Sequence, residues 1–152
     1  MSELEWGQIL DHFIHLGIAF LLAVPIAVNR ELSTRGVGLR TFPLVSVASC
    51  GYMLLAMQVY SGSDAEARVM YGLITGIGFI GGGAILKNGG NVSGTATAAS
   101  IWNTGAIGVS VAYSYYEIAI TLSLINFLVL QFGGVIKKEA QSARQDHDDV
   151  RR

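Results

Sequence analysis

Four long stretches of the chain contain no charged residue, and each is long enough to form a membrane-spanning helix. They run over residues 42–63, 69–86, 88–116 and 118–136. A helix needs roughly 20 largely apolar residues to cross a hydrocarbon core of about 30 Å. The pattern therefore predicts membrane helices at about 42–60, 69–86, 95–113 and 118–136. A fifth is predicted at about 9–28, with Asp11, His12 and His15 in its first turns.

The composition agrees with a membrane protein. Of the 152 residues, 51% are hydrophobic and 14% are charged, whereas soluble domains carry about 25% charged residues. We predict an all-α, polytopic membrane domain of about five helices over residues 1–138, in contact with the lipid bilayer. A polar cytoplasmic tail is expected over residues 139–152. The net charge of −1 gives no indication of nucleic-acid binding.

The basic residues are distributed unevenly between the two ends of the predicted bundle. Nine of the ten lie in the first and third connections or after the last helix, and only Arg68 falls at the other end. The positive-inside rule makes the side with nine basic residues cytoplasmic. Trp6 and five of the six tyrosines lie toward the opposite side, where aromatic rings with a polar tip anchor at the membrane interface. Both signals predict an N-terminus outside the cell and a cytoplasmic C-terminus.

Residues 76–81 read Gly-Ile-Gly-Phe-Ile-Gly and match the G-x-G-x-x-G fingerprint of dinucleotide-binding proteins. That fingerprint requires a preceding strand, a following helix and an acidic residue about 20 residues later. Here the motif lies inside a helix-length apolar run, and no Asp or Glu occurs between Glu66 and Glu117. We therefore exclude a nucleotide as the ligand and expect no cofactor.

Small residues recur at helical spacing in the third and fourth predicted helices. Gly72 and Gly76 form one G-x-x-x-G pair, and Gly78 and Gly82 form another. In the fourth helix the small residues follow every fourth position: Ala96, Ser100, Thr104, Gly108 and Ala112. Because small residues let helix backbones approach closely in lipid, we favour tight helix packing. In the alternative, the run of Gly81, Gly82 and Gly83 unwinds its helix and exposes carbonyl groups to a ligand, as in transporters with broken helices.

Polar residues at the helix ends and in the fourth helix are the candidates for chemistry. Asp11 and His15 share a helix face and are weak candidates for a cation or proton site. Asn103 lies near the middle of the fourth helix, where an amide usually bonds to a neighbouring helix but can also contact a substrate. The first basic connection holds the richest set: Arg30, Glu31, Arg35, Gly38, Arg40 and Thr41. One interpretation is an ion-pair lattice that holds two helices and docks a partner, and a second is a site for lipid phosphates. The third is that the positive charge only sets the orientation of the protein in the membrane.

The two predicted hairpins share a short pattern. The first contains Arg30 followed by Gly38 and Thr41, and the second contains Lys87 followed by Gly94 and Thr97. Both hairpins run from outside to inside and back, so a repeat of helices 1–2 in helices 3–4 would be parallel. The shared pattern is short, and chance similarity is the alternative.

Three segments occur in the order NRELSTRGVGLRT, GIGFIGGGAIL and GTATAASIWNTGAIGV. In this combination the chain resembles the transmembrane domain of the MgtC/SapB family of bacterial membrane proteins, over about residues 20–112. The resemblance implies a multi-pass inner-membrane protein linked to magnesium limitation and, in some pathogens, to survival inside host cells. We expect this chain to lack the soluble C-terminal domain that many members carry.

Two classes of function remain, because no constellation typical of a soluble enzyme occurs and we expect no enzymatic activity. The resemblance implies either magnesium transport or regulation of other membrane proteins. A magnesium pathway usually includes acidic residues, which the four uncharged stretches do not supply. We therefore predict a role in magnesium-linked ion homeostasis through contacts with a membrane-protein partner or a second copy. The alternative is a channel or transporter for Mg²⁺ or another cation, formed by the bundle or its oligomer.

Overall fold

The computed structural model describes residues 6–33, 38–88 and 91–149, without the side chains of residues 33, 88, 91 and 134–149. Two short strands, β1 (Leu86–Asn88) and β2 (Asn91–Ser93), pair antiparallel. The helices are α1 (Trp6–Ser33), α2 (Thr41–Val59), α3 (Ser63–Gly83), α4 (Thr95–Ala112) and α5 (Tyr116–Asp149). The all-α prediction is confirmed, whereas the small β1–β2 hairpin was not predicted.

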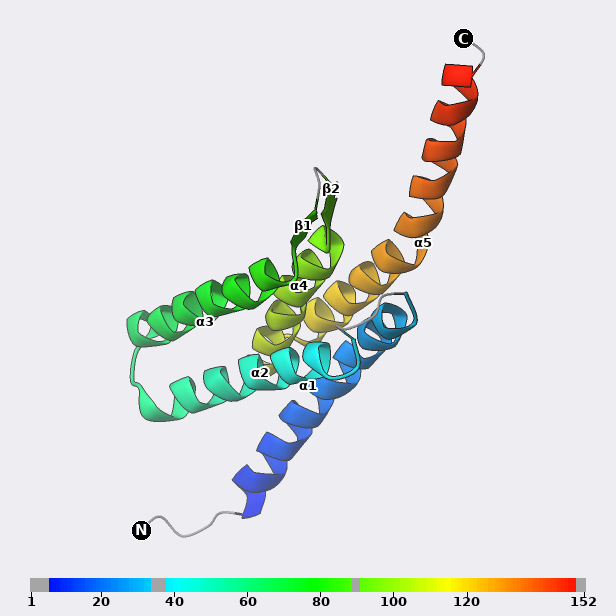
Figure 1. Ribbon diagram of the computed structural model, residues 1–152. Coiled ribbons are helices and arrows are strands. Elements are labelled where there is room, and N and C mark those ends of the chain that lie inside the picture. Colours follow the sequence, from blue (N-terminus) through cyan, green and yellow to red (C-terminus); the bar gives the residue numbers. More distant parts are fainter. Residues whose placement is uncertain (1–5, 34–37, 89–90, 150–152) are drawn as a thin grey trace.

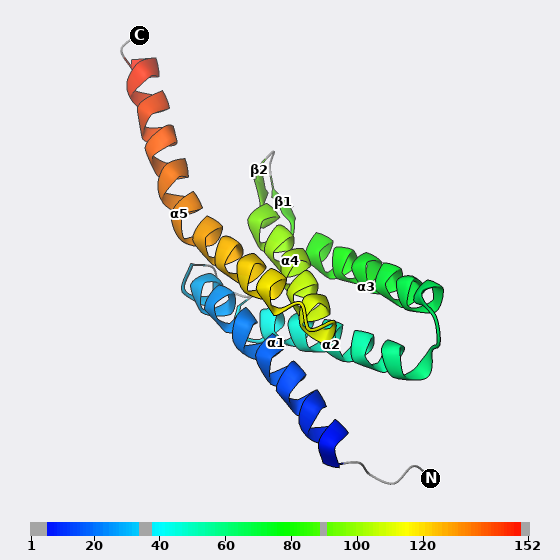
Figure 2. The ribbon, with the colours of Figure 1, turned by 180° about the vertical axis from the view of Figure 1, so that it is seen from behind.

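Helix α4 lies at the centre of the bundle and contacts each of the other four helices. Helices α2 and α3 form an antiparallel hairpin, and α1 packs along α5 (Figures 1 and 2). The beginning of α1 and the end of α5 lie at opposite ends of the molecule (Figure 1). We call the end formed by Gly38–Arg40, the β1–β2 hairpin and the start of α4 the basic end. The opposite end carries the α2–α3 and α4–α5 turns.

The central position of α4 follows from its small side chains. Nine of its 18 residues are buried, and Gly81 of α3 and the Ser46 carbonyl group of α2 lie close to its backbone. Its buried residues are Thr97, Ser100, Ile101, Thr104, Gly105, Ile107, Gly108, Val111 and Ala112. A helix made of such residues can be surrounded on all sides, because each neighbour can approach its backbone closely.

The helices begin and end at different distances from the expected positions, and α1 begins three residues earlier and ends five residues later than expected. Both ends of α2 and α4 lie within one residue of prediction, whereas α3 begins six residues before the predicted position and ends three residues early. The early start follows Gly62, whose φ of +122° turns the chain. Asp64 and Glu66 in the first turn also suit a helix N-terminus, where negative charge is stabilised by the helix dipole.

Three helices are long and apolar enough to cross a membrane by length and composition. They are α1 over Trp6–Leu32, α2 over Thr41–Val59 and α5 over Tyr116–Gly133. Within the described ranges α3 and α4 do not meet this criterion. Asp64, Glu66 and Arg68 lie in the first two turns of α3, and α4 is rich in Thr, Ser, Asn and Gly. Because four helices surround α4, its side chains need not be strongly apolar, and the five-span arrangement stays a prediction.

Helix α5 extends well past its predicted end near residue 136. It continues as one helix to Asp149 and carries the backbone of most of the predicted polar tail (Figure 1). The boundary between a membrane domain and a cytoplasmic tail at residues 138 and 139 therefore falls inside a continuous helix, and its position relative to a bilayer stays a prediction.

Candidate functional site

The basic end is held together by a bond between the two hairpins. A terminal nitrogen of Arg30, near the end of α1, donates to Thr97 Oγ1 in the first turn of α4 at 2.8 Å. Thr97 is buried, and Arg30 is half-buried beside it. Arg30 and Thr97 come from different copies of the short pattern shared by the hairpins. The polar candidates of the two hairpins therefore meet at one end of the bundle.

Glu31 and Gly38 lie against each other at the start of α2. The Leu39 amide donates to Glu31 Oε2 at 3.1 Å, so the carboxylate ties the connection back to α1. A Cβ atom added to Gly38 would overlap that carboxylate and lie 2.8 Å from the Glu31 nitrogen. Glycine is therefore required at this close approach, and Glu31 is bonded to backbone.

The other predicted residues of this connection have simpler surroundings. Arg40 is exposed and precedes α2, and its side chain makes no capping bond. Thr41 is the first residue of α2 and lies inside the helix. Arg35 lies outside the described residues, so a lattice of ion pairs that includes it stays a prediction.

A row of polar contacts joins α1 to α5, and we call it the polar seam. Ser123 Oγ donates to the Leu22 carbonyl oxygen at 2.6 Å, and Asn29 Nδ2 donates to Gln131 Oε1 at 2.6 Å. A third contact, between His15 and Tyr116, lies seven residues before the Leu22–Ser123 contact on both helices. Contacts at this spacing are typical of helices that pack in parallel. The seam runs from the opposite end to the basic end of the bundle.

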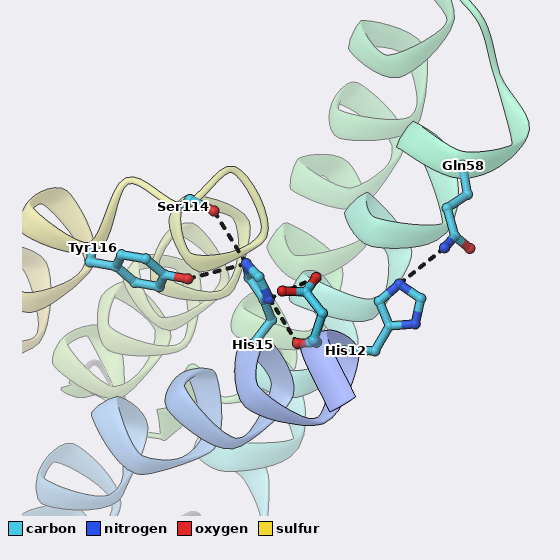
Figure 3. Close-up of polar contacts among 6 residues, drawn as sticks. His12, His15, Gln58, Ser114 and Tyr116 are labelled. Atoms are coloured by element: carbon cyan, nitrogen blue, oxygen red, sulfur yellow. Dashed lines mark hydrogen bonds and ion pairs between the residues drawn. The ribbon is translucent and has the colours of Figure 1, made fainter. Parts of the chain in front are cut away.

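The His15 side chain is buried where α1 meets the α4–α5 turn (Figure 3). Its Nδ1 atom lies 2.9 Å from the Asp11 carbonyl oxygen and 3.5 Å from Asp11 Oδ2. Because a carbonyl oxygen can only accept, Nδ1 carries a proton in this arrangement. In the neutral ring Nε2 is then an acceptor, and the hydroxyl groups of Ser114 and Tyr116 lie 3.2 and 3.1 Å from it.

These contacts give His15 a structural position rather than an open metal site. Both ring nitrogens are bonded within the chain, and among the described residues no group of three or more His, Cys, Asp or Glu side chains is placed to hold a metal ion. Ser114 has a φ of +59°, which is uncommon outside glycine, and its hydroxyl bonds to His15. His12, three residues before His15 on α1, accepts a hydrogen bond at its Nε2 atom from Gln58 Nε2 of α2 at 3.0 Å (Figure 3).

The polar residues predicted in α4 bond mainly to α5. Ser100 Oγ donates to Asn126 Oδ1 at 2.8 Å, and both side chains are buried. Asn103 Nδ2 donates to the Leu122 carbonyl oxygen at 3.2 Å, as expected for an amide that bonds across helices. Thr104 donates to the Ser100 carbonyl oxygen in its own helix at 2.7 Å.

Among the glycines whose surroundings the structure describes, three make close contacts between helices. A Cβ atom on Gly108 would overlap the Ser46 carbonyl oxygen of α2, and one on Gly81 would lie 3.1 Å from the Ala98 carbonyl oxygen of α4. A Cβ on Gly105 would overlap the end of the Ile77 side chain. Gly105 was not among the predicted packing residues because it lies beside, and not on, the small-residue line through Gly108.

Most of the predicted glycines of α3 do not pack inside the chain. An added Cβ meets nothing within 4 Å at Gly72, Gly76, Gly78, Gly82 and Gly83. The run of three glycines forms the last turn of α3, which is helical to Gly83, so the helix is not broken in its middle. Gly72 and Gly76 instead line a groove of about 850 Å³ between α2 and α3.

Comparison with known proteins places the chain in a family. A sequence profile of the MgtC family matches residues 16–139. The chain belongs to the MgtC family. It is 33% identical over 129 residues to the putative magnesium transporter YhiD of Escherichia coli K12, an alignment that covers 80% of this chain and 60% of YhiD. No solved structure is significantly similar to this chain.

Two further relatives bear other names. Protein MgtC of Brucella abortus is 42% identical over 104 residues, which cover 68% of this chain and 43% of the relative. Protein SapB of Bacillus subtilis is 28% identical over 156 residues, which cover 97% of this chain and 67% of the relative. The chain thus spans less than two thirds of the length of YhiD and of Brucella MgtC. The basic end, α3 and α4 all lie within the MgtC family match.

Proposed function

We propose that this MgtC-family protein supports magnesium-linked ion homeostasis in the bacterial inner membrane by regulating other membrane proteins through helix contacts. The main support for this proposal is the placement of the glycines. Gly105 and Gly108 of α4 allow close packing at the centre of the bundle, whereas Gly78 and Gly82 of α3 lie on the outside. The proposal includes the predicted orientation, with the N-terminus outside the cell and the basic end in the cytoplasm. It also includes a membrane-protein partner or a second copy of the chain.

The closed centre favours contacts over conduction. A Cβ atom on Gly108 of α4 would overlap the backbone of α2, Gly105 lies against the Ile77 side chain of α3, and Ser100 is bonded to α5. An ion that crossed within one copy would have to separate α4 from these neighbours. Packed helix interfaces of this kind switch between discrete arrangements and do not open gradually.

The outer face of α3 supplies a surface for another helix. Gly78 and Gly82 lie one turn apart, and Gly78 lies about 200° around the helix from Gly76, at about 100° per residue. The Gly78–Gly82 face is therefore directed away from the α2–α3 groove. Glycine within a helix costs roughly 0.5–1 kcal/mol relative to alanine. A partner helix that packs closely on this face would make use of the missing side chains.

Leucine at Gly82 tests the proposed contact face. We expect Gly82→Leu to fold normally, because nothing lies within 4 Å of the added Cβ, but to hold a partner helix away. In cells that depend on this protein for growth at low magnesium, the variant should grow like cells without the protein. The matched control is Gly17→Leu, which adds the same side chain at an open position of α1. Equal growth with the two variants, both inserted at normal levels, would contradict the contact role.

A transporter is the second candidate, and the polar seam favours it. Side chains of α1 and α5 place polar groups at intervals from His15 to Gln131, and the Ser100–Asn126 contact between α4 and α5 adds a further pair. YhiD carries the name of a putative magnesium transporter. Such a pathway would use the seam in an opened state of the bundle or in an oligomer.

A further inference from the structure

The groove between α2 and α3 covers only part of the length of the two helices. Its lining runs from Thr41 to Tyr52 on α2 and from Val69 to Ile80 on α3. Because the helices are antiparallel and joined at residues 60–62, Thr41 and Ile80 lie together at the basic end. Tyr52 and Val69 mark the other limit, which lies before the turn that joins the two helices. The groove therefore begins at the basic end and stops partway along both helices.

The length of the groove matches one leaflet of a bilayer. Residues 41–52 of α2 span about 16 Å at 1.5 Å per residue, and residues 69–80 of α3 span the same length. Half of a hydrocarbon core of about 30 Å is about 15 Å. A partner transmembrane helix would need a surface along the whole core, whereas an acyl chain needs one leaflet.

The walls and floor of the groove suit acyl chains. The exposed rings of Tyr52 and Phe79 and the side chain of Leu44 form its walls. Ser49 and Ile77 form its floor, and Gly105 of α4 lies directly behind them. Gly72 and Gly76 leave the α3 side open, because no atom lies within 4 Å of an added Cβ at either position.

The charge near the mouth of the groove is positive. Arg40 is exposed and directly precedes Thr41, and Lys87 is exposed four residues beyond the end of α3. The Glu31 carboxylate at this end is bonded to the Leu39 amide. Basic pockets between membrane helices on the cytoplasmic side bind anionic lipid headgroups. We propose that the groove binds an anionic phospholipid of the cytoplasmic leaflet, with its acyl chains between α2 and α3 and its phosphate near Arg40 and Lys87.

Lipid retention by the purified protein tests this site. The full chain is reconstituted in nanodiscs of phosphatidylglycerol with phosphatidylethanolamine, and bound lipid is measured by native mass spectrometry after release into detergent. We expect phosphatidylglycerol to be retained in preference to phosphatidylethanolamine. Lys87→Gln and Arg40→Gln should each weaken retention about fivefold, whereas Arg68→Gln at the other end should not. Gly76→Leu fills the groove and should abolish retention, and Gly17→Leu is its control.

Several outcomes would overturn the proposal. Equal retention of both lipids would remove the role of the basic residues, and retention by Gly76→Leu would place the lipid elsewhere. Protection of the protein against heat by inorganic phosphate alone would show an ion site instead. Cross-linking from a cysteine introduced at Tyr52 or Gly72 to another protein chain would show that a helix fills the groove. None of these results depends on growth at low magnesium, so the lipid site can fail while the proposed function holds.

Discussion

Replacing Gly108 by alanine is expected to lower the free energy of unfolding by ~3 kcal/mol, although the change adds a single methyl group. The Cβ atom would overlap the Ser46 carbonyl oxygen and lie 2.9 Å from the Ser46 carbonyl carbon and from Ser49 Cβ. Two of these atoms belong to backbone, so the strain cannot be relieved by a side-chain rotation. Helix α2 would have to move away from α4, which would loosen the contact between these two helices.

Thermal unfolding in detergent measures this effect. A loss of this size corresponds to a fall of the unfolding midpoint by roughly 6–12 °C in a chain of this length. The matched control is Gly78→Ala on the outside of α3, where nothing lies within 4 Å of the added Cβ. There, alanine should leave the midpoint unchanged or raise it, because alanine favours helix over glycine. Equal midpoints for the two variants would show that α2 and α4 are not in this contact.

Replacing Gly94 by alanine is expected to prevent the β1–β2 hairpin from closing onto α4. Gly94 has a φ of +83°, a conformation that costs other residues about 1–2 kcal/mol. An added Cβ would also overlap the Ala84 carbonyl oxygen and lie 3.3 Å from Ile85 Cα. The end of α3 would be forced away from the start of α4, which also carries Thr97, the acceptor for Arg30.

Gly62 provides a control that separates backbone strain from contact. Its φ of +122° also favours glycine, but nothing lies within 4 Å of an added Cβ. Gly62→Ala should therefore show only the conformational cost. Gly94→Ala should lower the unfolding midpoint clearly more, and it should support less growth at low magnesium. If the two substitutions lowered the unfolding midpoint equally, the close approach of Gly94 to Ala84 would be disproved.

The helices themselves were predictable because the charge-free stretches are long and their ends are marked by charges or glycine. The sequence also indicated that α4 carries a small-residue face, and Gly108 lies in contact as such a face requires. The role of the α3 glycines was harder to read, since a G-x-x-x-G pair does not say whether the contact lies inside the chain. Gly72 and Gly76 line a groove, and Gly78 and Gly82 face outward.

The partners of the polar candidates could not be read from the chain. His15 meets Ser114 and Tyr116 about 100 residues later, and Asn29 meets Gln131 at a similar separation. Such pairs depend on how α1 and α5 pack, which single-sequence periodicity does not specify. A usable signal was present in α5, where Tyr116 and Ser123 are seven residues apart and share the face that contacts α1.

The same geometry separates two ways of linking a membrane protein to magnesium. A regulator needs a stable bundle with an outward contact surface, and the closed centre of α4 with the outer glycines of α3 fits that need. A transporter needs a pathway, which here would have to follow the polar seam and open the α4 contacts. One relative, YhiD of Escherichia coli K12, is named a putative magnesium transporter, so the distinction requires a direct measurement on this chain.

Magnesium flux into proteoliposomes tests the central claim most directly. The purified chain is reconstituted in vesicles that contain phosphatidylglycerol, and Mg²⁺ entry is followed with an internal dye beside empty vesicles, with K⁺ flux measured in parallel. Insertion is confirmed by protease protection. A regulator that acts through helix contacts predicts no Mg²⁺ entry above that of the empty vesicles. Saturable Mg²⁺ entry that requires the protein and is lost in Asn29→Leu, which removes a seam contact with Gln131, would contradict the account and make the polar seam an ion pathway.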